Sequence, residues 1–371
     1  MQQHPQAAQH AATSAHRTAQ PGNEPHLEYV KDLLVRLLQT PSPTGDTSAI
    51  IHLLEEELAS LGFETRLNRK GGLLIDIPGQ DTSQRRFITG HVDTLGAMVR
   101  EILPSGRLRL HKIGGYAWNT ITGEYCAVTT QNGTLVTGTA MLHNTSVHVY
   151  SDVEKTTAET DNIEVVLDAK VTTADETRAL GVAVGDFVHW DPRVQWTDTG
   201  FIKSRHLDDK ASVAIIVGLL REFSQTQTTL PYNLTILISN NEEIGYGGNS
   251  NIPEDTVEYL AVDMGAIGDG QTTDEYCVSI CAKDASGPYH LGLRRHLTAL
   301  AVENQLKYAV DIYPNYGSDA SAAIRAGADI VHGLIGPGVA HSHAYERTHT
   351  EALDNTYRLL RAYLLSTTLQ A

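Results

Sequence analysis

The sequence has few cysteines, a shortage of positive charge and no long hydrophobic run, and each deficit excludes a class of protein. Its three cysteines, Cys126, Cys277 and Cys281, are too few and too odd in number for a disulfide framework. No apolar stretch approaches the roughly 18–20 residues of a membrane-spanning helix. With 28 Lys and Arg against 44 Asp and Glu, the net charge of −16 repels nucleic acid and anionic membranes. We therefore expect a reducing compartment, the cytoplasm, and neither a nucleic-acid nor a membrane partner.

Length and composition favour a globular protein with more than one domain. The chain of 371 residues is longer than one hydrophobic core usually serves, and 41% of its residues are hydrophobic. Residues 1–24 are rich in Gln, Ala, His and Thr, and they lack the apolar core of a signal peptide. We expect these residues to form a disordered tail, in which His4, His10 and His16 have no specific role.

Helices and strands are both expected between residues 25 and 96. Apolar residues recur first at helical spacing and then in short runs that Gly and Pro separate. The expected elements are helices over 28–38 and 47–61 and strands over 64–67, 73–77 and 86–90. The last of these strands delivers His91 at its carboxyl end.

Residues 97–204 differ in character, because helical periodicity disappears and short alternating runs replace it. The expected strands cover residues 107–113, 125–129, 134–137, 163–171 and 186–190. Asn132-Gly133 is a strong hairpin signal. We predict a small all-β barrel, inserted into a main domain of residues 25–96 and 205–371, where it serves as a lid or in oligomerisation.

Helices and strands alternate again after residue 205. The expected elements are helices over 211–223, 294–303, 320–325 and 351–365 and strands over 234–239, 257–263, 308–312 and 330–335. This alternation predicts an α/β fold with a doubly wound mixed sheet and helices on both faces. Sheets of this class place their sites beyond the carboxyl ends of the strands. His91, Glu242, Glu243 and Asp263 all lie at such ends.

Glu242 and Glu243 are adjacent at the end of a predicted buried strand. Two like charges there are unfavourable unless a positive group lies between them. A metal ion is the simplest such group, and an exposed loop pair is the ordinary alternative. Because neighbouring side chains on an extended segment point to opposite sides, we assign Glu243 as a metal ligand and Glu242 as a general base.

Each of the other candidate acids and histidines has a structural explanation as an alternative to a role in a metal site. In His91-x-Asp93 both side chains point the same way, so Asp93 can orient the imidazole, unless the pair lies in a surface loop. Asp208 precedes a helix and is either its N-cap or a carboxylate that bridges two ions. Asp263 is either a polar strand end or a metal ligand. The histidines that compete for one further ligand position are His341, His343 and His349.

Taken in order, these residues resemble a known family. The series His, Asp, Glu-Glu, Asp, His is similar to that of the dinuclear metallo-aminopeptidases of the tetrahedral aminopeptidase and glutamyl aminopeptidase family, metallopeptidase family forty-two. The resemblance covers most of the chain from about residue 27, including the β insertion and Tyr316-Gly-Ser-Asp-Ala-Ser321. It implies a zinc-peptidase-like fold, a homo-oligomer, and an enzyme that cleaves short peptides at their free N-terminus.

The resemblance also implies a cofactor and a role for each site residue. The cofactor would be two divalent ions per subunit, and ligands without thiolate suit zinc, cobalt or manganese. The implied roles are one ion held by His91 and Asp263, a second held by Glu243 and the last histidine, a bridging Asp208, the general base Glu242, and Asp93 as the residue that orients His91.

The chain departs from the usual family pattern at the last histidine. That pattern is His-Ser-Pro-x-Glu, whereas this chain reads His341-Ser-His-Ala-Tyr-Glu346. A divergent branch carries Ser-His-x-Tyr-Glu-Arg-Thr-His, which residues 342–349 match. We therefore choose His343 as the ligand, with His341 as the fallback, and we carry over no side-chain preference for the substrate.

Two rival hypotheses remain. The same metals and base would serve a deacylase or amidase that acts on a small N-acylated, peptide-like metabolite, because only the pocket would differ. A non-catalytic binding or assembly protein is the alternative from another class, and the intact Glu242 argues against it. A glycosidase needs two opposed carboxylates rather than imidazoles, so it is disfavoured.

Overall fold

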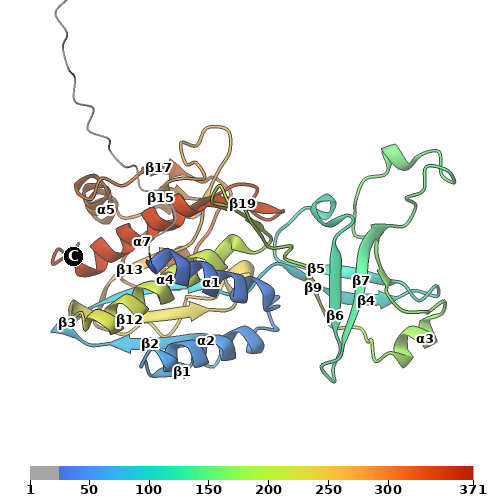
Figure 1. Ribbon diagram of the computed structural model, residues 1–371, viewed down its shortest axis with the longest axis horizontal. Helices are drawn as coiled ribbons and strands as arrows, with labels where there is room; N and C mark the ends of the chain where they lie inside the picture. Colours follow the sequence, from blue (N-terminus) through green and yellow to red (C-terminus); the bar gives the residue numbers. More distant parts are fainter. Residues whose placement is uncertain (1–24, 371) are drawn as a thin grey trace, which may run out of the picture.

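The computed structural model describes residues 25–370, and the tail expected over residues 1–24, with its three histidines, lies outside that range. Figure 1 shows an α/β part and a barrel that projects from one side of it. Among residues 25–370, none of the helices combines the length and the apolar character that crossing a membrane requires.

The α/β part is built on a mixed sheet. Its strands, in spatial order, are β1 (Thr65–Leu67), β2 (Leu73–Ile77), β12 (Leu230–Ser239), β3 (Gly79–His91), β13 (Thr256–Val262), β18 (Val331–Val339), β15 (Val278–Asp284) and β16 (Gly287–Pro288), with β17 (Tyr308–Ile312) beside β15 and β14 (Gly265–Ala266) beside β18. Strands β12, β3, β13 and β18 run parallel, whereas β2 and β15 are antiparallel to their neighbours β12 and β18. The parallel centre therefore brings four carboxyl ends to one edge.

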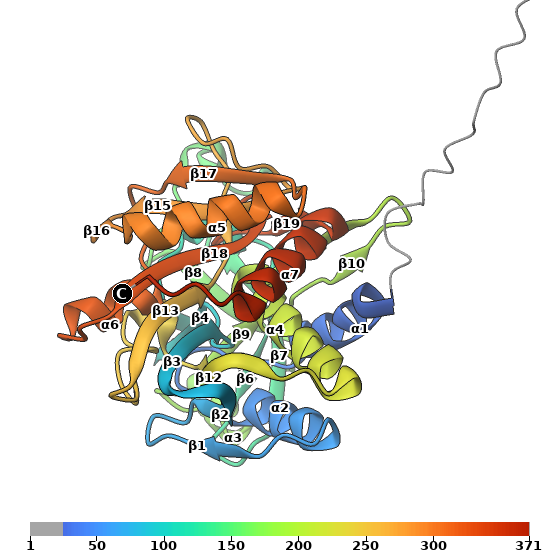
Figure 2. The ribbon, with the colours of Figure 1, turned by 90° about the vertical axis from the view of Figure 1, so that its left-hand side faces the viewer.

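Helices cover both faces of this sheet, as predicted. One face packs against α1 (Pro25–Gln39), α2 (Ser48–Ser60), α4 (Leu207–Thr226), α5 (Leu291–Glu303) and α7 (Thr350–Leu365), and the other against α6 (Asp319–Arg325). Figure 2 shows α1, α4 and α7 on one side of the strands and α6 on the other. Because side chains alternate along a strand, Ile88 joins the first core and Phe87 the second.

The segment between β3 and α4 forms the predicted barrel. Its strands close in the order β4 (Gly96–Ile102), β5 (Leu108–Ile113), β8 (Ile163–Leu167), β7 (Leu135–Leu142), β6 (Tyr125–Thr129) and β9 (Phe187–Trp190). The barrel has its own core, in which Leu110 and Val128 are fully buried. Asn132-Gly133 lies in the turn of the β6–β7 hairpin, as expected. The short helix α3 (Ala174–Ala179) lies between β8 and β9.

Several strands were missed, and each has a physical reason. β4 has an irregular register between Val99 and Glu101, which interrupts the alternation of apolar and polar residues. β15 is buried along nearly its whole length, but Ser279, Lys283 and Asp284 interrupt the apolar run that is typical of a strand buried on both faces. The short strands β10 (Gln195–Trp196) and β11 (Phe201–Ser204) form a separate sheet with β19 (Glu346–His349) from the far end of the chain.

This small sheet affects how the insertion is bounded. Residues 195–204 belong to the segment that we assigned to the insertion, but β10 pairs with β11 and β11 pairs with β19, and neither joins the barrel. We propose the division at residues 97–204 and a role of the insertion as a lid or in oligomerisation. The three cysteines are buried and free.

Candidate metal centre

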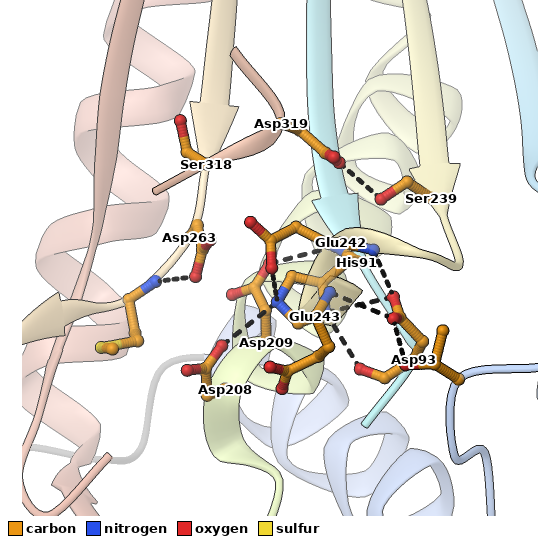
Figure 3. Close-up of polar contacts among 12 residues, drawn as sticks. His91, Asp93, Asp208, Asp209, Ser239, Glu242, Glu243, Asp263, Ser318 and Asp319 are labelled. Carbon is orange, nitrogen blue, oxygen red and sulfur yellow. Dashed lines mark hydrogen bonds and ion pairs between the residues drawn. The ribbon is translucent and has the colours of Figure 1, made fainter. Parts of the chain in front are cut away.

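The side chains chosen from the sequence meet at the carboxyl edge of the parallel strands (Figure 3). His91 ends β3, Asp263 follows β13, and Asp208 lies in the first turn of α4. Glu242 and Glu243 follow β12 in a short 3-10 helix, η3 (Glu242–Ile244). The parallel sheet thus gathers residues that are far apart in the chain.

His91 lies at the centre of this cluster and is 2% exposed. Its Nε2 lies 3.2 Å from Asp208 Oδ1 and 3.8 Å from Glu242 Oε2. Its Nδ1 lies 3.0 Å from the backbone oxygen of Asp93 and 3.5 Å from Oδ1 of the same residue. We expected the Asp93 carboxylate to orient the ring, but the shorter contact is with the Asp93 carbonyl. Backbone and carboxylate together turn Nε2 toward the acids.

The Asp93 carboxylate also holds the glutamate pair. Its Oδ1 accepts a hydrogen bond from the backbone N–H of Glu242 at 3.1 Å, and its Oδ2 accepts one from that of Glu243 at 3.2 Å. Oδ2 accepts a third from Thr44 Oγ1 at 2.7 Å. The pair lies in a 3-10 turn and not on the extended segment we assumed. Successive side chains in such a turn diverge by about 120°, so the two carboxylates still separate.

Two overlapping sets of side chains can hold a cation. Each brings three ligand atoms within 4.8 Å of one another, and the sets are His91, Glu242, Asp263 and His91, Asp208, Glu243. His343 extends the second set, with Nε2 3.4 Å from Asp208 Oδ2 and 3.5 Å from Glu243 Oε2. Ligand atoms that surround a tetrahedral ion at about 2.1 Å lie about 3.4 Å apart. The observed separations therefore fit a divalent ion.

The electrostatics of the cluster lead to the same conclusion. Burial raises the pKa of Glu243 to about 8 and that of Asp263 to about 7, and the charge of Asp208 acts in the same direction. Burial likewise raises the pKa of Glu242 well above its usual value. For Asp208, burial also acts to raise the pKa, but hydrogen bonds to His343 and His91 outweigh it and hold the pKa low. The two imidazoles thus do not balance the acids, and a cation would.

Of the three competing histidines, His343 is the one whose ring lies against the acids. Burial acts to lower its pKa, but the hydrogen bond to Asp208 and the charge of Glu243 outweigh this and raise the pKa to about 11. Its Nδ1 lies 2.5 Å from the backbone oxygen of Gly115 in the loop after β5. His341 lines the same cavity. His349 instead caps α7, where its Nδ1 accepts a hydrogen bond from the N–H of Glu351.

Three further acids support the cluster, and we did not select them from the sequence. Oδ2 of Asp209 accepts a hydrogen bond from the N–H of His91 at 3.2 Å. Glu346 accepts hydrogen bonds from the N–H groups of Asp208 and His343, at 3.1 and 3.2 Å. Asp319 contacts both ends of the glutamate loop. The motifs that we quoted contain Asp319 and Glu346, and Asp209 follows Asp208 directly, so position within or beside a motif was the available signal.

A cavity of about 790 Å³ opens above the cluster. Asp208, Glu242, Glu243, Asp263 and His343 line its base, and Met264, Ile267, Tyr316 and Arg325 are among its other lining residues. The space is large enough for a small molecule or the end of a peptide.

An α/β sheet that gathers imidazoles and carboxylates at its carboxyl edge, below a cavity, has the architecture of a metallohydrolase. The family follows from comparison with known proteins. Residues 71–359 match the Peptidase M42 model, described as M42 glutamyl aminopeptidase, so the chain belongs to this family of peptide-bond hydrolases. The family resemblance inferred from the motifs is thereby confirmed.

Individual relatives agree with this assignment. The chain is 58% identical over 335 residues to "Putative aminopeptidase YhfE" of Bacillus subtilis (strain 168), and the alignment covers 90% of this chain and 97% of the relative. A TET aminopeptidase from the archaeon Thaumarchaeota archaeon SCGC AB-539-E09 has the same fold, with a TM-score of 0.83, 18% identity, and coverage of 92% of this chain and 97% of that one. Pyrococcus horikoshii TET1 peptidase, with a TM-score of 0.80, 20% identity, and coverage of 91% and 99%, is described as able to assemble into a tetrahedron or a large octahedral shell.

Proposed function

We propose that this protein is a dinuclear metallo-aminopeptidase that removes N-terminal residues from short peptides. One divalent ion would be held by His91 and Asp263, with Glu242, the third member of that set, acting as the base and not as a ligand, and the other ion by Glu243 and His343, with Asp208 between them. The observation that carries this proposal is the position of Asp208: its Oδ1 lies 3.2 Å from His91 and its Oδ2 lies 3.4 Å from His343. One carboxylate thus faces both imidazoles, as a bridging ligand must.

When bound, two divalent ions supply Lewis acidity, which lowers the pKa of a water molecule and polarises the amide carbonyl. The residues of this chain perform the proton transfers. Glu242 takes the proton of the attacking water and then gives it to the leaving amine. Asp93 holds Glu242 in place through its backbone N–H, and it turns Nε2 of His91 toward the acids. Zinc, cobalt and manganese all suit these ligands.

A short peptide is the proposed substrate, and a homo-oligomer the proposed state. The name of the 58% identical relative and the family description support an aminopeptidase. The assemblies described for TET1 peptidase support oligomerisation, with the subunit number left to measurement. The cytoplasm remains the location expected from the sequence.

The closest chemical alternative is an amidase or deacylase on a small N-acylated metabolite. Glu242 and the ligand cluster would serve that reaction equally well, because they act on the amide and not on its substituents. The two activities differ in whether the substrate presents a free amino group. A panel of substrates with and without that group separates them.

The test uses the full chain loaded with zinc, cobalt or manganese. Short peptides, aminoacyl amides and their N-acetylated counterparts are supplied, and the released amines are measured. We expect cleavage of the free-amine substrates only, and a loss of 10²–10⁴-fold in kcat for Glu242→Gln with its metal content unchanged. Cleavage confined to N-acylated substrates supports the deacylase instead. Undiminished cleavage by Glu242→Gln removes Glu242 from the mechanism.

A further inference from the structure

The loop that carries Glu242 and Glu243 has no apolar anchor at its tip. Ile244 and Tyr246 are 41% and 44% exposed, although both side chains are large and hydrophobic. The short helix η3 buries no apolar side chain, because its one apolar residue is the exposed Ile244. Hydrogen bonds must therefore fix the position of the two carboxylates.

Asp319 connects the two ends of this loop. It is the first residue of α6 and is 3% exposed. Its Oδ2 accepts a hydrogen bond from Ser239 Oγ at 2.5 Å (Figure 3). Its Oδ1 accepts one from the backbone N–H of Gly248 at 2.5 Å. Ser239 ends β12 just before the glutamates, and Gly248 follows them. A single carboxylate thus fixes the span of residues 239–248.

Two glycines allow this close approach. A Cβ atom on Gly247 would lie 2.7 Å from Asp319 Oδ1, and one on Gly248 would lie 2.6 Å from Asp319 Cβ and 2.1 Å from Tyr259 Oη. Tyr259 Oη in turn donates a hydrogen bond to the carbonyl of Gly248 at 2.9 Å. The loop is therefore shaped to receive Asp319 on one side and Tyr259 on the other.

Asp319 is itself firmly held. Ser318 caps α6, since its Oγ accepts a hydrogen bond from the N–H of Ser321 at 3.3 Å and its N–H donates to Ser321 Oγ at 2.9 Å. Ser318 Oγ also lies 2.6 Å from Tyr289 Oη. Asp319 belongs to neither of the two ligand sets. Its hydrogen bonds reach the site through the ends of the loop.

We propose that Asp319 is a positioning residue that holds Glu242 in its working place, a role that rests on the proposed function. Asp93, two residues after the end of β3, accepts hydrogen bonds from the N–H groups of Glu242 and Glu243, and Asp319 holds the two ends of the loop at Ser239 and Gly248. Without Asp319, the loop keeps the hydrogen bonds to Asp93, the one from Tyr259 to the Gly248 carbonyl, and those from Lys70 Nζ to the carbonyls of Tyr246 and Gly247. It loses the one side chain that connects Ser239, before the glutamates, with Gly248, after them. A displacement of about 1 Å at a reacting group lowers a rate on the order of 100-fold.

The test compares Asp319→Ala and Asp319→Asn with the matched control Asp186→Ala. Asp186 is 4% exposed and accepts a hydrogen bond from the N–H of Ala183 at 2.7 Å, but it lies in the barrel. We expect Asp319→Ala to lose about 100-fold in kcat, with KM within threefold and the full metal content. Asp319→Asn retains an oxygen for the Gly248 N–H and should lose about tenfold. Asp186→Ala should keep kcat within twofold.

A double variant tests whether Asp319 acts through Glu242. If it does, Asp319→Ala combined with Glu242→Gln is no slower than Glu242→Gln alone, because a misplaced base and an absent base are equivalent. Multiplication of the two losses overturns the proposal. So does a kcat within twofold of wild type for both Asp319 variants. If the alanine variant does not fold, the asparagine variant alone decides between these outcomes.

Hydrogen exchange separates this inference from the proposed function. We expect amide exchange in residues 240–248 to rise at least tenfold in Asp319→Ala and to stay unchanged in Asp186→Ala. This measurement needs no substrate, so it still reports on Asp319 if the wild-type protein cleaves no amide and the proposed function fails. Unchanged exchange in the loop overturns the role of Asp319 even if the enzyme is active.

Discussion

Strand β3 carries one buried charged residue along its length and a buried histidine at its carboxyl end, and the two surroundings differ. Arg86, five residues before His91, is 2% exposed and pairs with Glu258, which is 0% exposed, at 3.0 Å. Arg86 also donates hydrogen bonds to the carbonyls of Tyr363, Ser366 and Thr368, and Glu258 accepts them from Tyr363 Oη and the N–H of Gln370. At the carboxyl end, His91 contacts several carboxylates, and one of these, Asp208, also contacts the imidazole of His343.

The difference separates structural charge from functional charge. In the Arg86–Glu258 network one cation is paired with one anion, and each of the two side chains also has further hydrogen-bond partners. The network therefore needs no additional charge to be stable. Glu242, Glu243 and Asp263 have raised pKa values, chiefly through burial, because the protein alone supplies too little positive charge. Neutralising a residue of the Arg86–Glu258 network should therefore affect folding, and neutralising one of the acids around His91 should affect chemistry.

The largest effect is expected from Asp208→Asn. Its carboxylate faces His91 with one oxygen and His343 with the other, so the amide weakens both ion positions at once. We expect kcat/KM to fall about 10⁴-fold, which corresponds to about 5.4 kcal/mol of activation free energy. Metal content, measured on the purified variant, should fall below two ions per subunit.

Glu258→Gln is the matched control in the Arg86–Glu258 network. It also replaces a buried carboxylate by an amide, and it leaves Arg86 without a counter-charge. This variant should keep the kcat of its folded fraction and its metal content while it loses stability. Equal losses of activity in the two variants would contradict the separation of structural from functional charge.

The second prediction concerns stability in place of activity, and its variant is Arg86→Met. Removing the guanidinium leaves Glu258 buried and uncompensated, which is expected to lower the free energy of unfolding by about 3–5 kcal/mol. Denaturant unfolding measures this loss, and kcat at a permissive temperature should stay within twofold of wild type. The double variant Arg86→Met, Glu258→Leu should recover much of the stability, because replacing both charges removes the unpaired one.

The sequence predicted those site residues whose positions follow from the periodicity of the strands. His91 and the glutamates could be placed because each follows a buried strand, and parallel strands bring their carboxyl ends together. The same logic missed Asp319 and Glu346, since each reaches the site from an element whose approach depends on the whole fold. Thr44 lies between the helices expected over residues 28–38 and 47–61, in a stretch to which we gave no role in the site. Its hydroxyl nevertheless donates a hydrogen bond to the Asp93 carboxylate.

Two fold features also lay beyond local patterns. β15 is buried on both faces, yet Ser279, Lys283 and Asp284 interrupt the apolar run by which such a strand is recognised in a sequence. β11 pairs with β19 across about 145 residues of chain, and no local signal specifies such a partner. The choice between His341 and His343 came from a motif and not from spacing. The backbone does not distinguish the two residues, because both have a positive φ, 60° and 62°.

The third prediction concerns those two histidines. His343→Ala removes the imidazole that lies 3.5 Å from Glu243, so we expect a loss of about 100-fold in kcat/KM and weaker binding of one ion. His341→Ala is the matched control, since His341 lines the same cavity only two residues away. It should change kcat/KM by less than threefold. Titration of the metal-free variants with zinc measures both affinities, and a larger effect from His341 would exchange the two assignments.

The smallest effect is a gain of stability in the metal-free protein. Burial raises the pKa of Glu243 to about 8 from a usual value of 4.5, so between these pH values the unfolded chain releases a proton that the folded chain retains. The metal-free protein should therefore become less stable as pH rises from 5 to 8, and Glu243→Gln should remove part of that slope. At pH 8 we expect the variant to be more stable by about 1–2 kcal/mol without metal, although it is inactive.

Zinc should make the wild type the more stable of the two proteins, because it stabilises the wild type by about 2.7 kcal/mol at one hundred times its dissociation constant and the variant by less. Thermal unfolding with and without a chelator measures both, and a metal-free variant less stable than wild type would mean that Glu243 is paired within the protein, as Glu258 is.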